Sequence, residues 1–337
     1  MFKTFKKLII ASLLVVNLYS CSIFSQEEKI QKSLFNKNYD FNLVNWQTEE
    51  NSNIIILAIH GYNDYSNAFK EPAEIFSKHN ISTYSFDLRG FGTNSSTGDW
   101  FQLEVHCNDI KKIILDLKFR NPSKKIFLLG ESMGAAISIS LANQIDELPL
   151  DGLILVAPAI WNFSESNYFK SLFLKFFSTI FPKLKVSGKG IIKIRPSNNI
   201  EMLREFSNDP LVIRKPNLKS LHGVVNLMDQ SFIDTKEYLL NPKFPTLLII
   251  PVIDEIVPRK PLIKILKDTK VQKNFSKLIN IKIYENNFHM ILRDINGNEI
   301  ANDIKDWIKK ENKENNFKSI SKIITKLEDS NFYHRLD

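Results

Sequence analysis

Residues 125–136 read KIFLLGESMGAA, and the rest of the fold follows from this segment. The apolar run 126–129 comes after Pro122 and two lysines, which is the pattern of a fully buried β-strand. Gly-x-Ser-x-Gly follows directly at residues 130–134, and small residues then continue a helical pattern through Ala142. We therefore expect a strand, a sharp turn and a helix in immediate succession.

That succession is the setting of a nucleophile elbow, in which a serine sits on a strained turn at the end of a central strand. Gly130 and Gly134 leave space where any side chain would clash. The helix after Ser132 directs its first N–H groups and its positive dipole end towards a developing oxyanion, so the backbone amide of Met133 is one expected donor. An ordinary tight turn is the alternative, but the flanking strand and helix favour the elbow.

A serine nucleophile needs a base, and the chain contains six histidines. Folds with such an elbow place the acid, and then the histidine, after the serine. His334 lies in the polar tail, and the histidines at positions 60, 79, 106 and 222 precede every acid that could follow a suitable strand. His289 is therefore the expected base, with an ordinary loop histidine as the alternative.

The acid is expected just after the strand that precedes His289. Asp254 lies four residues past the predicted strand 246–250. A carboxylate there can hold His289 in one tautomer and stabilise its protonated form. Three competitors remain open, namely Glu255, Asp229 and Asp234.

Five motifs in this order resemble the α/β-hydrolases, in the branch that contains monoacylglycerol lipases, lysophospholipases and the serine aminopeptidase domain. The motifs are His60-Gly61, Asp87-Leu88-Arg89-Gly90-Phe91-Gly92, Gly130-Glu131-Ser132-Met133-Gly134, Asp254-Glu255-Ile256-Val257-Pro258 and His289. The resemblance covers roughly residues 50–310 and implies that Tyr62 supplies a second oxyanion-hole amide. It also implies that His60 bonds loop backbone beneath the site. Pro251 departs from the family, which usually has glycine three residues before the acid.

The wider pattern predicts an α/β-hydrolase fold with a mostly parallel sheet, helices on both faces and an inserted helical cap. The near-continuous apolar strand 54–59 is typical of a sheet covered on both faces. Further strands are expected at 81–86, 152–157 and 279–284. The hydrolase domain is expected to cover residues 39–310, and its cap about 158–234.

Residues 168–180 of the expected cap carry phenylalanine and leucine at helical spacing. One interpretation is that this apolar face packs onto the hydrolase body. The other is an acyl-chain pocket or a membrane-docking face, because basic amphipathic helices favour anionic interfaces.

Residues 1–20 are predicted to be a signal peptide, because three lysines precede an apolar run at 8–18 that is too short to span a bilayer comfortably. Leu18-Tyr19-Ser20-Cys21 resembles the lipobox of bacterial lipoproteins, which implies cleavage before Cys21 and acylation of its thiol. An uncleaved anchor or a plain signal peptide is the alternative. Ser22 implies sorting to the outer membrane, facing the periplasm, in a Gram-negative host.

Residues 21–38 are then a polar tether, and residues 311–337 form a charged C-terminal tail with one helix expected near 317–327. The formal charge of +8 falls to +5 without residues 1–20, which carry three lysines and no acidic residue. Such an excess favours anionic lipid surfaces or solubility. No basic run interleaved with aromatic residues suggests nucleic acid as a partner.

With Cys21 acylated, Cys107 stands alone, so we expect neither an intramolecular disulfide nor a zinc site. The sequence contains no Gly-x-Gly-x-x-Gly, so no cofactor is expected. Serine at position 132 also argues against haloalkane dehalogenases and epoxide hydrolases, relatives that need aspartate there. The oligomeric state is left open.

Together, these features predict a serine hydrolase that cleaves carboxylic esters of single-chain lipids, monoacylglycerol or lysophospholipid, through an acyl-enzyme on Ser132. An aminopeptidase or amidase of the same fold is one alternative. It would need an acidic pocket for the substrate's amino group, whereas the cap contains more lysine than glutamate. A non-catalytic surface lipoprotein is the other alternative, and it would predict an eroded triad.

Overall fold

The computed structural model describes residues 43–46, 52–145, 147–187, 194–310 and 320–329. The predicted signal peptide, Cys21 and the polar tether all lie outside the described residues. The chain divides into residues 1–43 and 44–337, and the second unit contains the fold from Val44 onward. Within the described ranges, none of the helices combines the length and the apolar character needed to span a membrane.

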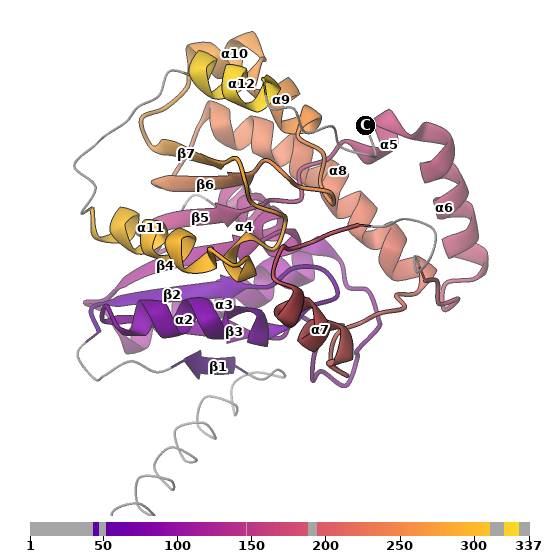
Figure 1. Cartoon of the computed structure of the whole chain (residues 1–337), viewed down its shortest axis with the longest axis horizontal. Coiled ribbons are helices and arrows are strands. Elements are labelled where there is room, and N and C mark those ends of the chain that lie inside the picture. Colours follow the sequence, from indigo (N-terminus) through magenta and orange to yellow (C-terminus); the bar gives the residue numbers. More distant parts are fainter. Residues whose placement is uncertain (1–42, 47–51, 146, 188–193, 311–319, 330–337) are drawn as a thin grey trace, which may run out of the picture. The chain divides into compact units, whose positions relative to one another are not determined.

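Seven strands form one sheet in the order β1-β3-β2-β4-β5-β6-β7 (Figure 1). Every neighbouring pair from β3 to β7 is parallel, which confirms the expected mostly parallel sheet. The strands are β1 (Leu43–Trp46), β2 (Ile54–Ile59), β3 (Ile81–Phe86), β4 (Lys125–Glu131), β5 (Gly152–Val156), β6 (Thr246–Pro251) and β7 (Ile279–Tyr284).

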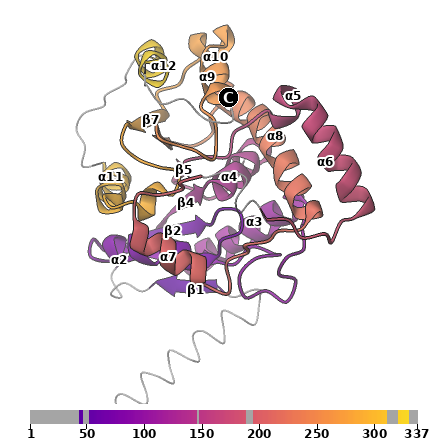
Figure 2. The same cartoon turned by 45° about the vertical axis from the view of Figure 1, so that its right-hand side comes forward.

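Helices cover both faces of this sheet (Figures 1 and 2). One face carries η1 (Ser66–Phe69), α2 (Lys70–Ser77) and α11 (Gly297–Lys309). The other carries α3 (Leu103–Arg120), α4 (Met133–Gln144) and the long α8 (Leu218–Leu240). Near β7 lie α9 (Lys260–Leu266), α10 (Thr269–Lys273) and α12 (Ile320–Glu328). The last of these falls within the expected tail and packs against α9 and β7.

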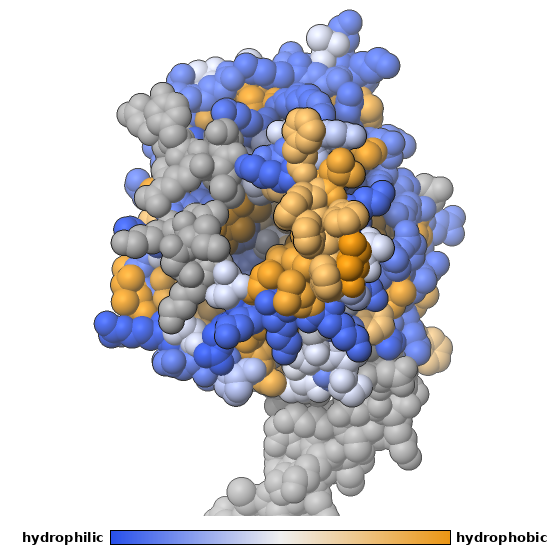
Figure 3. Space-filling view, turned by 90° about the vertical axis from the view of Figure 1, so that its right-hand side faces the viewer, coloured by the Kyte–Doolittle hydropathy of each residue, from blue (hydrophilic) through white to orange (hydrophobic). Residues whose placement is uncertain are grey.

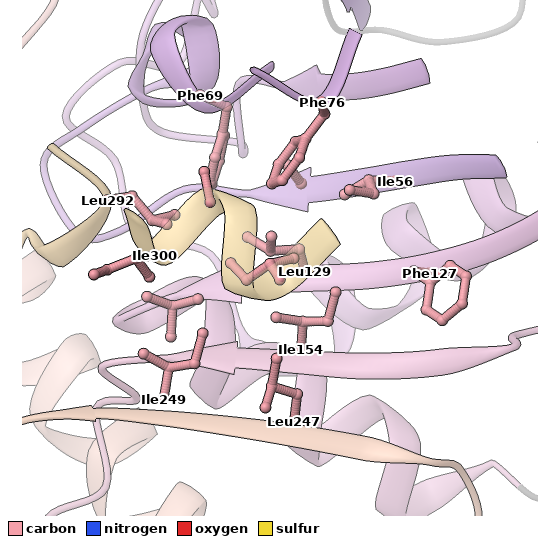
Figure 4. Close-up of a cluster of buried hydrophobic side chains, with 14 of the residues drawn as sticks. Ile56, Phe69, Phe76, Phe127, Leu129, Ile154, Leu247, Ile249, Leu292 and Ile300 are labelled. Carbon is pink, nitrogen blue, oxygen red and sulfur yellow. The ribbon is translucent and has the colours of Figure 1, made fainter. Parts of the chain in front are cut away.

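The core between the sheet and α2 and α11 is built from alternate strand residues and aromatic rings (Figure 4). Phe69 and Phe76 descend from η1 and α2 onto Ile56 and Leu129 of the central strands. Because helices also cover the opposite face, the central strands are apolar throughout rather than alternating. The carboxyl ends of these strands are thereby held rigidly at one edge.

The cap consists of α5 (Phe163–Ser166), α6 (Tyr168–Ile180), α7 (Ile200–Asn208) and the first part of α8. Asn217 begins α8 by accepting a hydrogen bond from the Ser220 amide at 2.8 Å. The predicted cap boundary at residue 234 falls inside α8, which continues to Leu240 and packs against α4.

The apolar side of α6 faces outward. Of its residues only Ser178 is buried, whereas Phe169 is 82% exposed and Phe173 65% exposed. The interpretation that this face packs onto the hydrolase body is therefore wrong for most of its large side chains, although Leu174 and Phe177 are half-buried. We call the exposed group the α6 apolar surface: Tyr168, Phe169, Leu172, Phe173, Phe176 and Ile180.

Candidate active site

Ser132 lies at the end of β4 with φ 54° and ψ −113°, a conformation that L-residues rarely adopt. The two glycines of the motif make this turn possible. A Cβ atom on Gly130 would lie 2.4 Å from the Gly134 carbonyl oxygen. One on Gly134 would lie 2.1 Å from the carbonyl oxygen of Ile59 on β2. Close packing of α4 against the sheet therefore requires both glycines.

The structure brings Ser132, His289 and Asp254 together in one chain of hydrogen bonds. His289 Nε2 is 2.8 Å from Ser132 Oγ, and His289 Nδ1 is 2.7 Å from Asp254 Oδ2. With Asp254 ionised, Nδ1 carries the ring proton and donates it to the carboxylate. Nε2 is then the acceptor for the serine hydroxyl proton, which is the arrangement a nucleophilic serine requires.

Asp254 is held in place by the backbone of its own loop. Its Oδ1 accepts from the amides of Ile256 and Val257 at 2.8 and 2.9 Å, leaving Oδ2 for the histidine. Pro251, the last residue of β6, does not prevent this turn. The competing carboxylates are engaged elsewhere: Glu255 accepts from the Arg195 amide, Asp229 from Ser164, and Asp234 from Ser140 and Gln230.

The environment of His289 favours its protonated form. Burial alone would lower the pKa of His289, but the Asp254 carboxylate reverses this effect and the pKa is raised above 6.5. The Glu131 carboxylate contributes in the same direction. A raised pKa means that the imidazolium is stabilised once the ring has taken the serine proton.

The turn after β2 lies directly against the nucleophile. A Cβ atom on Gly61 would be 3.4 Å from Ser132 Cβ and 3.9 Å from its Oγ. This brings the following amide, that of Tyr62, to the same edge as the Met133 amide at the start of α4. Among the described residues neither amide has a hydrogen-bond acceptor. The Tyr62 hydroxyl contacts Ser220 Oγ on α8 at 2.9 Å, which ties this turn to the cap.

Two of the remaining motifs, at His60 and Asp87, hold the loops next to the carboxyl ends of β2 and β3. His60 bonds loop backbone, as expected: its Nε2 accepts from the Leu88 amide at 2.9 Å, and its Nδ1 donates to the Gly61 carbonyl at 2.8 Å. Asp87 accepts from the Ser66 amide at 2.9 Å and from the Thr93 amide at 2.8 Å. These buried bonds explain why a histidine and an aspartate follow two adjacent strands.

A group of buried charged side chains, which was not predicted from the sequence, lies beside the active site. Arg293 Nη2 donates to Asp64 Oδ2 at 2.5 Å and lies 3.4 Å from Glu131 Oε2. A carboxylate directly before the nucleophile, at a position that the strand pattern predicts to be buried, is the signal that could have revealed it. We call Asp64, Arg293 and Glu131 the charged triad.

The arrangement can carry out acyl transfer: a serine activated by a histidine, a carboxylate that orients the histidine, and two amides for an oxyanion. Among the residues described, no group of three or more histidine, cysteine or acidic side chains is placed to hold a metal ion.

Comparison with known families agrees with this geometry. The family described as "Serine aminopeptidase, S33" matches residues 50–296 of the chain. Human monoglyceride lipase is 25% identical over 271 residues, which cover 78% of this chain and 84% of that protein. Phospholipase YtpA of Bacillus subtilis is 25% identical over 211 residues, covering 62% of this chain and 79% of that protein.

Two solved structures share the fold. A monoacylglycerol lipase of Paleococcus ferrophilus has a TM-score of 0.63 at 22% identity, over 79% of this chain and 97% of that one. A soluble variant of monoglyceride lipase from Saccharomyces cerevisiae, in complex with a substrate analogue, has a TM-score of 0.67 at 19% identity, over 80% and 91%.

Proposed function

Because the chain belongs to the serine aminopeptidase S33 family of α/β-hydrolases, we propose that it hydrolyses carboxylic esters of single-chain lipids, monoacylglycerol or lysophospholipid. Support comes from the geometry of Ser132, His289 and Asp254 and from the similarity to a monoglyceride lipase and a phospholipase. The observation that carries the lipid substrate is the α6 apolar surface.

In the proposed reaction, Ser132 Oγ attacks the ester carbonyl carbon while its proton passes to His289 Nε2. The carbonyl oxygen becomes an oxyanion, for which the Tyr62 and Met133 amides are the donors. The intermediate then expels the alcohol, which receives the proton from His289, and leaves an acyl-enzyme on Ser132. A water molecule, deprotonated by His289, releases the fatty acid and restores the hydroxyl. Asp254 keeps the ring oriented and stabilises its charge in both steps.

A lipid substrate accounts for apolar side chains that would otherwise be left in water. The α6 apolar surface forms a continuous patch, and a hollow opens at its margin (Figure 3). Exposed patches of this kind mark contact with apolar ligands, partners or membranes. An amide substrate with a free amino group would instead need an unpaired carboxylate. The carboxylates of the matching motifs each have a partner already: Asp87 has the Ser66 and Thr93 amides, Glu131 has Arg293, Asp254 has His289 and Glu255 has the Arg195 amide.

We also propose that the enzyme works at a membrane surface, anchored by a lipid on Cys21, at the outer membrane facing the periplasm of a Gram-negative host. The lipobox-like residues before Cys21 support this proposal, as does the α6 apolar surface. Incorporation of labelled palmitate into wild type, and its loss in Cys21→Ala, is the expected result. Equal labelling of both proteins would contradict the anchor.

Hydrolysis of 4-nitrophenyl esters from two to sixteen carbons, together with monoacylglycerol, lysophospholipid and an aminoacyl anilide, tests the substrate class. We expect kcat/KM to rise with chain length and the anilide to be a poor substrate. A strict preference for acyl chains of two to four carbons would contradict the proposed lipid substrate. Preferred cleavage of the anilide would favour an aminopeptidase. No labelling of Ser132 by a fluorophosphonate would favour a non-catalytic lipoprotein.

A further inference from the structure

Arg293, the last residue of η2 (Ile291–Arg293), joins the end of β4 and the turn after β2 through the charged triad. Its guanidinium contacts two carboxylates, and its Cζ also lies 5.6 Å from the centre of the Phe206 ring on α7 of the cap. Each member is close in sequence to a reacting group: Asp64 follows Tyr62 by two residues, Glu131 directly precedes Ser132, and Arg293 follows His289 by four. The segments that carry the oxyanion donor, the nucleophile and the base are therefore linked.

The triad is buried and its hydrogen bonding is incomplete. Glu131 is 2% exposed, Asp64 4% and Arg293 8%. Within the described part of the chain, Glu131 Oε1 and Arg293 Nε have no hydrogen-bond partner. Two buried carboxylates share one guanidinium, and apolar residues would stabilise a fold at least as well. Unsatisfied polar atoms of this kind in a native structure call for an explanation beyond packing.

The position of Glu131 supplies that explanation. It is the residue before the nucleophile, and its carboxylate contributes to raising the pKa of His289. The pKa of Glu131 itself is raised: burial raises it, and Arg293 opposes only part of that rise. In its ionised form, with Arg293 as its counter-ion, Glu131 stabilises the imidazolium that forms when Ser132 attacks.

We infer that Glu131 and Arg293 are positioning residues for hydrolysis: Arg293 holds the oxyanion-hole loop against the elbow, and Glu131 places a buried carboxylate directly behind the nucleophile. This inference rests on the proposed hydrolase function. It assigns to the residue before the nucleophile an electrostatic role that the Ser132–His289–Asp254 chain alone does not contain.

Other charged groups surround the triad and His289 and must be separated from its effect. Asp254 bonds His289 directly, so its influence is constant across variants of the triad. The remaining groups that face Arg293 or its neighbours are His60 beneath the β2 turn, Asp87 after β3 and Glu71 on α2.

The experiment follows the rate constant for labelling of Ser132 by a fluorophosphonate across pH, using the full chain in detergent. This readout requires the serine and histidine but no knowledge of the substrate. Glu131→Gln removes a charge without changing shape and leaves Arg293 and Asp64 as a neutral pair, so the variant is expected to fold. On the acid side of this profile the labelling rate falls as His289 becomes protonated, and we call this part the acidic limb. We expect the acidic limb to move to lower pH by roughly one unit in Glu131→Gln, because the support for protonated His289 is lost.

Asp64→Asn is the complementary variant. It weakens the link to the oxyanion-hole loop but leaves Glu131 in place. We expect the plateau rate to fall about tenfold, less than the ~10²–10³-fold for a lost oxyanion donor, with the acidic limb unmoved. The exposed Glu71→Gln is the matched control, since it also removes a carboxylate facing Arg293, and both limb and plateau should stay as in wild type.

Glu131→Asp keeps the carboxylate, so the acidic limb of its pH profile should lie closer to that of wild type than the limb of Glu131→Gln does. An unmoved limb in a folded Glu131→Gln, with wild type labelled normally, overturns the inference and leaves the hydrolase function intact. Failure of wild type to be labelled at all overturns the proposed function instead. If Glu131→Gln does not fold, Glu131→Asp and Asp64→Asn still decide: a wild-type plateau in Asp64→Asn contradicts the positioning role of Arg293.

Discussion

The two apolar helices α4 and α6 have opposite surroundings. Ten of the twelve residues of α4 are buried, against a single residue of the thirteen in α6. The first helix is rich in glycine, alanine and serine, which allow close approach to the sheet, whereas the second carries large aromatic rings. One helix buries nearly all its apolar side chains within the chain, whereas the other packs one side against α8 and leaves most of its large apolar side chains exposed.

Apolar side chains serve different purposes in these two helices. In α4 they pack the helix closely against the sheet, with the β2 backbone meeting the helix at Gly134, and this packing supports Ser132. In α6 most of the large side chains are exposed, so we expect them to act by their exposed area rather than by fit. Substitutions should therefore affect stability and intrinsic chemistry in the first helix, and access to aggregated lipid in the second.

The largest effect is expected from Ser132→Ala at the start of α4. Loss of the hydroxyl removes the nucleophile, so kcat should fall roughly 10⁶-fold, as for other activated serines. The turn is retained, so the melting temperature should not fall. Ester hydrolysis and fluorophosphonate labelling measure this directly, and residual activity within tenfold of wild type would contradict the nucleophile assignment.

Gly134→Val tests the close packing of α4. A Cβ atom at this position would lie 2.1 Å from the Ile59 carbonyl oxygen, so we expect a loss of about 3 kcal/mol or more in the free energy of unfolding. Thr179→Val on the exposed side of α6 is the matched control and should stay within about 0.5 kcal/mol of wild type. Urea denaturation of both variants measures the difference. Equal urea midpoints for the two variants would contradict the prediction that α4 is closely packed at Gly134.

Phe169→Ser tests the α6 apolar surface. Removing one exposed ring should lower the rate on monoacylglycerol in anionic vesicles about tenfold, because burial of a phenylalanine contributes about 1.5–3 kcal/mol. The rate on soluble 4-nitrophenyl butyrate should not change. Phe119→Ser on α3 is the matched control, since that ring is 85% exposed against 82% for Phe169. Equal losses in both variants would show that exposure alone, and not the position on α6, matters.

The smallest effect at neutral pH is expected from His106→Leu on α3, which packs beside α4. Among the described residues His106 has no partner for either ring nitrogen, and burial lowers its pKa to about 3. Between pH 6.5 and 3 the unfolded chain therefore binds a proton that the folded chain does not. Wild type should lose up to about 1.4 kcal/mol of stability per pH unit through that window, and the variant should lose less.

Urea midpoints at pH 7.5 and pH 4.5 measure this difference between wild type and His106→Leu. His79→Leu in the turn after α2, where the side chain is half-buried rather than buried, is the control and should keep the acid sensitivity of wild type. The same acid sensitivity in His106→Leu would contradict the unpaired, buried state of His106.

Much of the sheet could be predicted because parallel strands covered on both faces are nearly uniform apolar runs. The strands at 54–59, 81–86 and 279–284, and the helix 168–180, have the expected bounds. Ser132, Asp254 and His289 could be singled out because the elbow pattern fixes the order in which acid and base follow.

The sequence did not reveal α8, although it is 23 residues long. Pro210 and Pro216 lie just before this helix, and Gly223 interrupts its apolar pattern. That glycine is needed because Trp100 packs against it: a Cβ atom there would lie 2.1 Å from the indole ring. Asn217, the capping residue, was the available signal.

Two further features depend on tertiary contacts that no local pattern contains. The α6 periodicity predicts an amphipathic helix but does not say whether a partner covers its apolar face. The charged triad joins positions 64, 131 and 293, and only the strand order brings these positions together. The predicted burial of Glu131 signals that it needs a partner, but no local pattern identifies Arg293 and Asp64 as the residues that it joins.

The left-handed φ of Ser132 has a thermodynamic consequence. A non-glycine residue held in such a conformation costs about 1–3 kcal/mol, which glycine at this position would relieve. Ser132→Gly should therefore raise the melting temperature while abolishing hydrolysis. The elbow thus exchanges thermal tolerance for a reactive hydroxyl.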